Sequence, residues 1–267
     1  KADGPNMEMV EAQVRRPQVK GIWCVPKYSN PTGNIYSAEV VDRFARLGNQ
    51  AAPDFRIMWD NAYAVHDHHP HATELTNLME LCRLQGTEDS VFMMGSSSKV
   101  TLAGAGISFL GGSKSNLDYF LQQMACWTIG PDKVNQLRHA RLLPDLAATK
   151  KHMLRHAEIT RPKFELVLDK LEESFSGLEM GTWIRPEGGY FVSFDSLPGH
   201  AKEIVRLAGE AGVKLTPAGS TFPYGVDPED KNIRLSPTFP PLADLSAAME
   251  VFVNCVQLAT LRQHLNQ

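Results

Sequence analysis

The sequence predicts an α/β protein in which a mostly parallel sheet with flanking helices is followed by a smaller α+β region. In the first half, short apolar runs alternate with amphipathic stretches, which is typical of βαβ units and hence of a parallel sheet. After Gly111-Gly112 this alternation stops, and long helical segments precede the last strands. We therefore expect a large domain over residues 1–143 and a small C-terminal domain over residues 144–267.

The elements of the first half follow from apolar spacing and from turn residues. Gly21–Val25 is a buried apolar run that Pro26 ends. From Ser37, a residue type that caps helices, apolar residues recur at helical spacing up to Gln50. The other elements expected here are strands at 55–59, 91–94 and 107–110 and a helix at 73–84.

The second half is predicted to be richer in helix. Strands that return only after a long helical connection indicate a separate α+β domain. The expected helices cover 113–127, 132–143, about 144–175, 200–211 and 242–261, and the expected strands cover 190–194, 213–216 and 233–235.

Composition and charge exclude several classes of protein. Of the 267 residues, 43% are apolar and 21% are charged, which excludes collagen-like, disordered and disulfide-scaffold chains. The net charge of −3 gives no electrostatic reason to expect a nucleic-acid or membrane partner. The longest weakly polar stretch, Val100–Gly112, is too short and too rich in glycine to span a bilayer. The four cysteines are widely spaced without a C-x-x-C pair, so we expect free thiols and a cytoplasmic location.

Three polar clusters follow three of the predicted strands. Asn30-Pro31-Thr32-Gly33 follows the first strand, Asp60 ends the second, and Ser96-Ser97-Ser98-Lys99 follows the third. In open α/β sheets the ligand crevice lies outside the carboxyl ends of the strands, so parallel strands would direct all three clusters to one crevice. Each cluster taken alone is equally well explained as a turn. Their coincidence favours a binding site.

The residue types in these clusters form a coherent chemical set. Lys99 could form a Schiff base with an aldehyde cofactor, and Asp60 could pair with a pyridinium nitrogen, as pyridoxal phosphate enzymes require. Tyr63 and Asn30 could both bond the phenolic oxygen of that cofactor. The serines before Lys99 offer hydroxyl groups to a phosphate.

Six motifs carry a resemblance to a known family. The sequence resembles the class I/II aminotransferases of fold type I, and stretches 25–30 and 98–106 are most similar to a bacterial aspartate aminotransferase subgroup sometimes called MocR-like. The matching motifs, in order, are NPTG at 30–33, DNAY at 60–63, SSSK at 96–99, PEGGYF at 186–191, PAGSTF at 217–222 and NIRL at 232–235.

The resemblance implies roles for the cofactor-binding residues. Lys99 would be the catalytic Schiff-base lysine and would move a proton between the substrate Cα and the cofactor carbon C4′. Asp60 would pair with the pyridinium, while Tyr63 and Asn30 would bind the phenolic oxygen. The phosphate would be bound by serines of the SSSK motif, Ser96 and Ser98.

The resemblance also implies a substrate-binding residue and shows one departure from the family. Arg234 would hold the substrate α-carboxylate with its planar guanidinium, although a surface arginine at a strand edge is the alternative. The family usually has a phosphate-binding arginine at the position of Ile107. Ser98, Ser108, a backbone nest or a helix N-terminus would have to replace it.

The activity implied is that of a pyridoxal 5′-phosphate-dependent aminotransferase. It would move an amino group from an α-amino acid to a 2-oxo acid by a ping-pong mechanism, with aspartate and 2-oxoglutarate as the pair that the resemblance indicates. A dicarboxylic substrate needs a second cation, and Lys133, Arg138 and Arg141 are candidates. The family also implies a homodimer.

Two other functions remain open from the sequence. The chain could be the cofactor-binding sensor domain of a MocR-type transcription regulator, or a β-lyase on the same scaffold. Compared with the family pattern, the chain begins shortly before the NPTG strand. We therefore expect the N-terminal part of the large domain, with its cofactor-stacking aromatic residue and part of the phosphate cup, to lie outside it.

A histidine-rich segment at 66–71 raises the question of a metal site. Its spacing fits no zinc template, and Pro70 within it indicates a loop. We therefore predict no metal centre and a solvated loop near the rim of the crevice, with His66 close enough to Tyr63 along the chain to reach the site.

Overall fold

The computed structural model describes residues 3–265 and divides the chain into two compact units. Two short segments of the first half belong to the second unit, and the chain changes units for the last time between Met153 and Leu154. This point lies inside helix α6, so it differs from the boundary expected at 143/144. The first unit comprises the chain up to Tyr28, Asn34–His66 and Thr73–Met153, and the second comprises Ser29–Gly33, Asp67–Ala72 and the chain from Leu154 onward.

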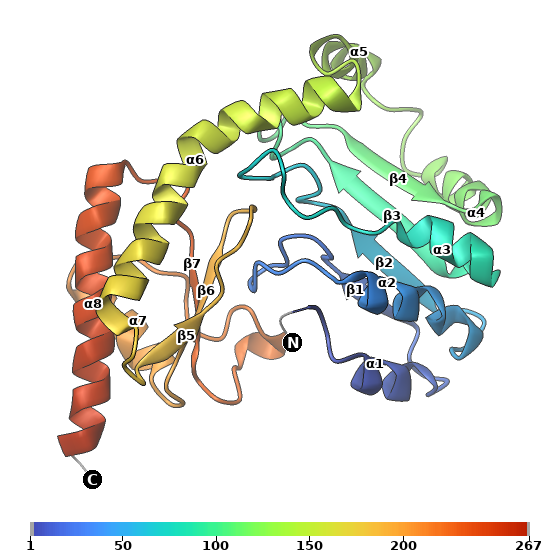
Figure 1. Cartoon of the computed structure of the whole chain (residues 1–267). Helices are drawn as coiled ribbons and strands as arrows, with labels where there is room; N and C mark the ends of the chain where they lie inside the picture. Colours follow the sequence, from blue (N-terminus) through green and yellow to red (C-terminus); the bar gives the residue numbers. More distant parts are fainter. Residues whose placement is uncertain (1–2, 266–267) are drawn as a thin grey trace. The chain divides into compact units, whose positions relative to one another are not determined.

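The first unit contains a four-stranded sheet whose strands lie in the order β1-β2-β3-β4 (Figure 1). Strands β1, β2 and β3 are parallel, and β4 is antiparallel to β3. The predicted mostly parallel sheet is therefore confirmed. The strands are β1 (Gly21–Cys24), β2 (Arg56–Asp60), β3 (Val91–Ser96) and β4 (Ser108–Gly112).

Helices and short 3₁₀ turns connect these strands. Ser37 caps α2 as predicted, with its hydroxyl oxygen accepting a hydrogen bond from Val40 N at 3.3 Å. Helix α3 starts later than expected because the Asn77 side chain caps it by accepting from Met79 N. The helical elements are α1 (Met7–Val14), α2 (Ala38–Ala45), η1 (Leu47–Asn49), α3 (Leu78–Gln85), η2 (Glu88–Ser90), α4 (Lys114–Met124) and α5 (Lys133–Leu142).

Burial of alternate β2 residues fixes which face of this sheet carries the core. Ile57 and Trp59 are fully buried, and the Trp59 ring packs against Phe44 of α2 with centroids 5.5 Å apart. Helix α1 also contributes Met7 and Val14 to this core. This packing holds the carboxyl ends of β1, β2 and β3 at one sheet edge.

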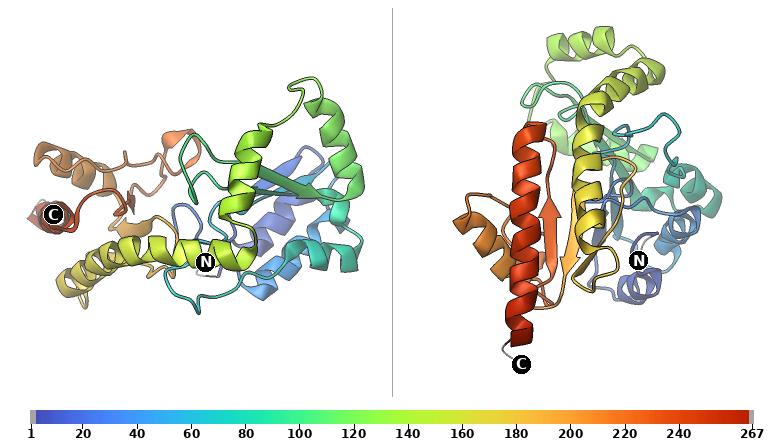
Figure 2. Two further views of the ribbon diagram at one scale, coloured as in Figure 1. Left: turned by 90° about the horizontal axis from the view of Figure 1, so that it is seen from above. Right: turned by 60° about the vertical axis from the view of Figure 1, so that its left-hand side comes forward.

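The second unit is an antiparallel sheet of order β5-β6-β7 with three helices (Figures 1 and 2). Side chains of all three helices share one core with β6 and β7. The elements are α6 (Leu146–Phe175, which begins in the first unit), β5 (Gly181–Trp183), β6 (Val192–Ser196), α7 (Ala201–Glu210), η3 (Pro223–Gly225), β7 (Asn232–Leu235) and α8 (Leu242–Leu265).

Two features of the second unit differ from the expectation. The strand predicted at 213–216 is not formed, because this segment pairs with no strand and instead lines a pocket. Strand β5 was not predicted, since three residues carry too short a pattern to recognise.

Helix α8 is long and apolar enough to cross a membrane over Leu242–Arg262, with a mean hydropathy of 1.3. The prediction that Val100–Gly112 is the longest weakly polar stretch is therefore wrong. Its Phe252 and Val256 are buried against the sheet of the second unit, so we interpret α8 as a core helix.

The cysteines carry free thiols, as expected. Cys126 is exposed, while Cys24, Cys82 and Cys255 are buried. Burial raises the pKa of the Cys24 thiol to about 12, so this thiol is protonated at neutral pH.

Candidate active site

The first unit brings together three predicted site residues at the carboxyl ends of β2 and β3. Asp60 is the last residue of β2, and Lys99 follows the end of β3, which is parallel to β2. The Lys99 Nζ lies 5.1 Å from the centroid of the Tyr63 ring. An amine, a carboxylate and a phenol therefore gather at one edge of the sheet, which is where ligands bind in open α/β folds.

Two donors fix the Asp60 carboxylate. Its Oδ1 accepts a hydrogen bond from Ala62 N at 3.1 Å, and its Oδ2 accepts one from Trp23 Nε1 at 3.3 Å. Trp23 lies on β1, and its side chain is 63% exposed. Each carboxylate oxygen has further acceptor capacity, so Asp60 can also accept from a ligand N–H.

The segment 97–107, which we call the lysine loop, is closed by Ser97. Ser97 is buried, its Oγ accepts from Ile107 N at 2.9 Å, and its own N–H donates to Ile107 O at 2.9 Å. Gly106 is required here, because a Cβ on it would lie 2.7 Å from Ser98 Cα. Lys99 is thus presented on a loop whose two ends are tied together.

Ser96 and Ser98 are brought into contact. The Ser96 hydroxyl donates to Ser98 Oγ at 2.9 Å and accepts from Ser98 N at 3.1 Å. Ser108 lies directly opposite Ser96 in the β3–β4 ladder, and cross-strand partners share a sheet face. Hydroxyl groups therefore cluster beside the lysine loop, while Ile107, at the family's arginine position, contributes its backbone to closing the loop.

The segment 66–71 is not the solvated loop that was expected. His66 and His68 are 3% and 5% exposed, because each packs into one of the two units, whereas His69 and His71 are exposed. His66 Nε2 lies 3.2 Å from Lys99 O, and its ring meets the Tyr63 ring edge-on at 5.5 Å. His66 thus reaches the site. Among the side chains that the structure describes, which exclude those of residues 263 and 264, no group of three His, Cys, Asp or Glu is placed to hold a metal ion.

The second unit brings together Asn30 and Arg234. Arg234 Nη1 donates to Asn30 Oδ1 at 3.0 Å, and its Cζ lies 4.5 Å from the centroid of the Phe191 ring. The Nε of Arg234 is buried and has no hydrogen-bond partner. A stacked, hydrogen-bonded guanidinium of this kind differs from a solvated strand-edge arginine, and its remaining N–H groups can bind a carboxylate.

The three cations proposed for a second carboxylate, Lys133, Arg138 and Arg141, are all exposed on α5. Arg138 Nη2 donates to Asn135 Oδ1 at 2.9 Å. Among the described contacts, none joins Lys133, Arg138 or Arg141 to Lys99, so their role in binding a second carboxylate stays a prediction.

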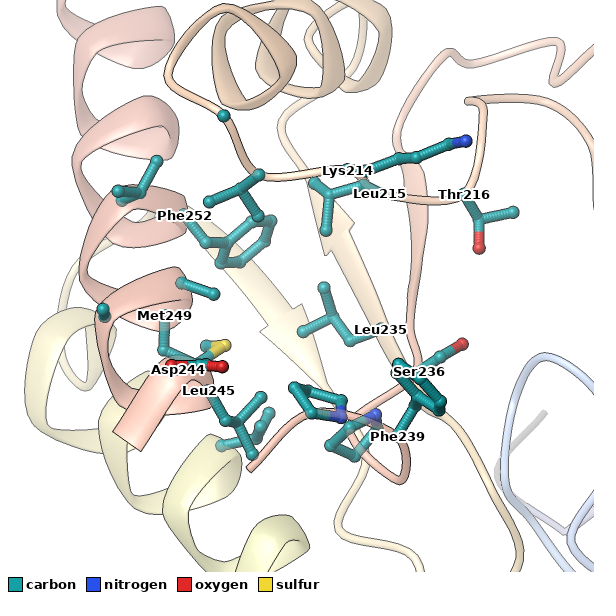
Figure 3. A pocket seen from close by; sticks show the side chains of 18 of the residues that line it. Lys214, Leu215, Thr216, Leu235, Ser236, Phe239, Asp244, Leu245, Met249 and Phe252 are labelled. Carbon is teal, nitrogen blue, oxygen red and sulfur yellow. The ribbon is translucent and has the colours of Figure 1, made fainter. Parts of the chain in front are cut away.

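The second unit also contains a pocket of about 640 Å³ (Figure 3). Leu245, Met249 and Phe252 of α8 face Leu215 and Leu235 across it, as Figure 3 shows. Its wall is mainly apolar, which does not suit a phosphate group. The amine, carboxylate and hydroxyl groups at the sheet edge of the first unit suit a phosphate-bearing cofactor better than this pocket does.

Comparison with known proteins identifies the family. The aspartate amino-transferase family matches residues 1–267. The chain belongs to this family. It is 43% identical over 264 residues to an aspartate aminotransferase of Corynebacterium glutamicum, which covers 99% of this chain and 61% of that protein. A Mycolicibacterium smegmatis relative is 47% identical over 258 residues, 96% of this chain and 60% of its own length.

Solved structures of the aminotransferase fold agree with this assignment. A crystal structure of a Corynebacterium glutamicum aspartate transaminase matches with a TM-score of 0.95 at 42% identity, over 98% of this chain and 62% of that chain. An α-aminoadipate aminotransferase from Thermus thermophilus matches with a TM-score of 0.80 at 22% identity, a likeness of fold alone. The predicted fold class and the predicted family are therefore confirmed. The aminotransferase-family chain spans about 60% of the length of its curated relatives.

Sequence reasoning missed two side chains of this aminotransferase-family site. Phe191 supports the Arg234 guanidinium, and Trp23 donates to Asp60. Phe191 is the last residue of the PEGGYF motif, so its position was visible, but its contact was not. Trp23 was expected inside a buried strand, but it is 63% exposed, and the sequence carries no signal for that exposure.

Proposed function

We propose that the protein is a pyridoxal 5′-phosphate-dependent aminotransferase that moves an amino group from an α-amino acid, aspartate first among them, to a 2-oxo acid such as 2-oxoglutarate. The observation that carries the proposal is the gathering of Lys99, Tyr63 and Asp60 at one sheet edge, with the Lys99 amine against the Tyr63 ring. The name of the Corynebacterium glutamicum relative supports aspartate as the donor.

The residues at this edge fit the chemistry of the proposed cofactor. The Asp60 carboxylate would accept from its ring N–H, and the clustered hydroxyls of Ser96, Ser98 and Ser108 would donate to its phosphate. Tyr63 would donate to its phenolic oxygen. When bound, pyridoxal phosphate supplies an electron sink for the electron pair of the substrate Cα–H bond.

Lys99 would transfer the proton, and Arg234 would bind the substrate. The Lys99 Nζ, once released from the cofactor by the incoming amine, would take the proton from the substrate Cα. Arg234 would bind the α-carboxylate through N–H groups not engaged by Asn30. Since Asn30 Oδ1 already accepts from Arg234, its amide NH₂ remains the group to donate to the phenolic oxygen.

The assembly and location expected for this function are those of the family. We propose a homodimer in the cytoplasm, with amino acids and 2-oxo acids as its partners and without nucleic acid or membrane. Equilibrium sedimentation of the purified protein tests the dimer, because a protomer mass at micromolar concentration would contradict it.

The experiment is a panel of amino donors with 2-oxoglutarate, using protein expressed with every residue that its gene encodes. Loss of the visible band of the lysine-linked cofactor reports the first half-reaction. We expect aspartate to react and glutamate to form. Release of pyruvate or ammonia without an acceptor would indicate a β-lyase, and a bound cofactor that no donor changes would indicate a sensor domain.

Two substitutions assign the residue roles. Lys99→Ala should abolish the visible band of the lysine-linked cofactor, and a band that persists would contradict the proposal. Arg234→Lys should weaken amino-acid binding while the cofactor stays bound, because a lysine cannot make the two parallel bonds of a guanidinium. Arg185→Lys is the matched control, since Arg185 is an exposed arginine paired only with Asp169 among the ion pairs of the described residues. Loss of cofactor with unchanged substrate affinity would refute the role of Arg234.

A further inference from the structure

Three histidines from separate parts of the chain contact three consecutive residues of the lysine loop. His66 Nε2 lies 3.2 Å from Lys99 O, and His152 Nε2 lies 2.8 Å from Val100 O. His139 Nε2 lies 2.9 Å from Thr101 Oγ1. These histidines come from the segment after β2, from the start of α6 and from α5, all within the first unit.

The chemistry of these contacts fixes which atom donates. A backbone carbonyl oxygen can only accept, so His66 and His152 must each donate from an Nε2–H group. His139 Nδ1 lies 2.9 Å from Asn135 O and must donate to it. In the neutral imidazole, Nε2 therefore accepts from the Thr101 hydroxyl, whose single proton is shared with Ser97 O at 3.2 Å. Each contact is thus a directional hydrogen bond rather than general packing.

The bonds from His66 and His152 satisfy carbonyl groups that accept no hydrogen bond from within the turn. The internal bonds of the turn run from Val100 N and Thr101 N to Ser97 O, so they use neither Lys99 O nor Val100 O. A buried polar group costs free energy unless it is bonded, and an apolar side chain could fill the same space without that cost. His66 Nε2–H supplies such a bond to Lys99 O.

His66 has a second contact that bears on the reactive amine. Its ring lies edge-on to the Tyr63 ring, against whose face the Lys99 Nζ is placed. One imidazole therefore sets both the backbone from which Lys99 projects and the aromatic ring beside its amine. The other two histidines anchor the residues that follow Lys99.

We propose that His66, His139 and His152 are positioning residues, which hold the lysine loop so that the Lys99 amine stays in place for bond formation and proton transfer. The proposal rests on the proposed function, in which Lys99 carries the cofactor. None of the three histidines is assigned contact with substrate.

The test compares two substitutions at His66 and at His152. Leucine removes the donor, whereas glutamine places an N–H donor near the position of Nε2. His69→Leu is the matched control, because His69 is an exposed neighbour of His66 in the same segment. Hydrogen–deuterium exchange of the 97–107 peptide is measured first, on the cofactor-free protein.

We expect both leucine variants to speed exchange of the 97–107 peptide by about tenfold, the effect of one lost hydrogen bond, with other peptides unchanged. Glutamine variants should restore exchange to within about threefold of the wild type. Unchanged exchange in the leucine variants, or glutamine variants that behave as leucine does, would overturn the proposal. If His66→Leu does not fold, the comparison of His152→Leu with His152→Gln tests the proposal, because His152 is only half-buried and its substitution disturbs the core less.

The second readout is the first half-reaction of the complete protein with aspartate. The leucine variants should lower its rate constant at saturating amino acid by about tenfold while the amino-acid Kd changes less than about twofold, since Arg234 is untouched. A change confined to Kd would contradict a positioning role. A wild type that never links cofactor to Lys99 would refute the proposed function instead, and the exchange result would still test the three histidines as anchors of the loop.

Discussion

Burial of the His68 side chain makes the free energy of unfolding depend on pH. The imidazole is 5% exposed and packs on Phe164 with ring centroids 4.4 Å apart. Burial lowers the pKa of His68 to about 4, opposed by a hydrogen bond to the Gly189 backbone and by the charge of Asp67. The positive charges of His69 and Arg161 assist the lowering. The folded protein therefore keeps His68 neutral at a pH where the unfolded chain protonates it.

The sign and size of the effect follow from these pKa values. The ordinary pKa of 6.5 applies to the unfolded chain, so the contribution is complete above about pH 7 and is lost as the pH falls through 6.5 toward 4. Proton binding to the unfolded chain then lowers the free energy of unfolding by about 2 kcal/mol at pH 5 and about 3 kcal/mol at pH 4.

Urea unfolding at pH 7.5, 6 and 5 tests this, with wild type and His68→Gln measured side by side. Glutamine does not titrate, so the difference in unfolding free energy between the two proteins should shift by about 2 kcal/mol over this range, whatever the glutamine costs at neutral pH. His71→Gln, at an exposed position of the same segment, should follow the wild-type curve. Parallel curves for wild type and His68→Gln would refute the burial argument.

Three further predictions concern packing, thiols and substrate binding. Gly219→Ala should lower the unfolding free energy by roughly 2–4 kcal/mol in a denaturation assay, because φ is +83° and a Cβ would lie 2.3 Å from a backbone carbonyl oxygen. Gly177→Ala, with φ of +74° and open space around it, should cost only about 1 kcal/mol, and equal losses would contradict the steric reason. In a thiol titration of the native protein Cys126 alone should react at once, and the others should react only after denaturation. Phe191→Leu should weaken amino-acid binding about threefold by removing the ring beneath Arg234, as read from the Kd of the first half-reaction, and an unchanged Kd would show that the stacking is dispensable.

Much of the fold was predictable because its strands are short apolar runs bounded by turn residues. The spacing of Val40, Val41 and Phe44 and the cap at Ser37 predicted where α2 begins, but the helix ends at Ala45 and not at the expected Gln50. The predicted strand at 213–216 failed because apolar content alone does not supply a neighbouring strand to pair with. Pairing partners are a property of tertiary structure, which local sequence does not contain.

The candidate site was predictable where a motif ends a strand and not where side chains meet across elements. Asp60 and Lys99 were placed by their position after β2 and β3. The contacts of Lys99 O with His66 and of Val100 O with His152 involve partners far apart in sequence, and a lone histidine is an ordinary surface residue by composition. No spacing rule links such partners, so only the folded chain reveals them.

The loops after β1 and β2 each contain a segment that belongs to the second unit, where Arg234 lies. Both segments lie against the PEGGYF element. Gly33 lies so close to Pro186 that a Cβ on Gly33 would be 3.0 Å from the Pro186 Cβ. His68 N donates to Glu187 O at 2.9 Å. The same element ends in Phe191, which supports Arg234. Residues that follow β1 and β2 therefore contact the element that supports the guanidinium proposed to bind substrate. A substitution in either loop should change amino-acid affinity even when Lys99 and its neighbours are intact.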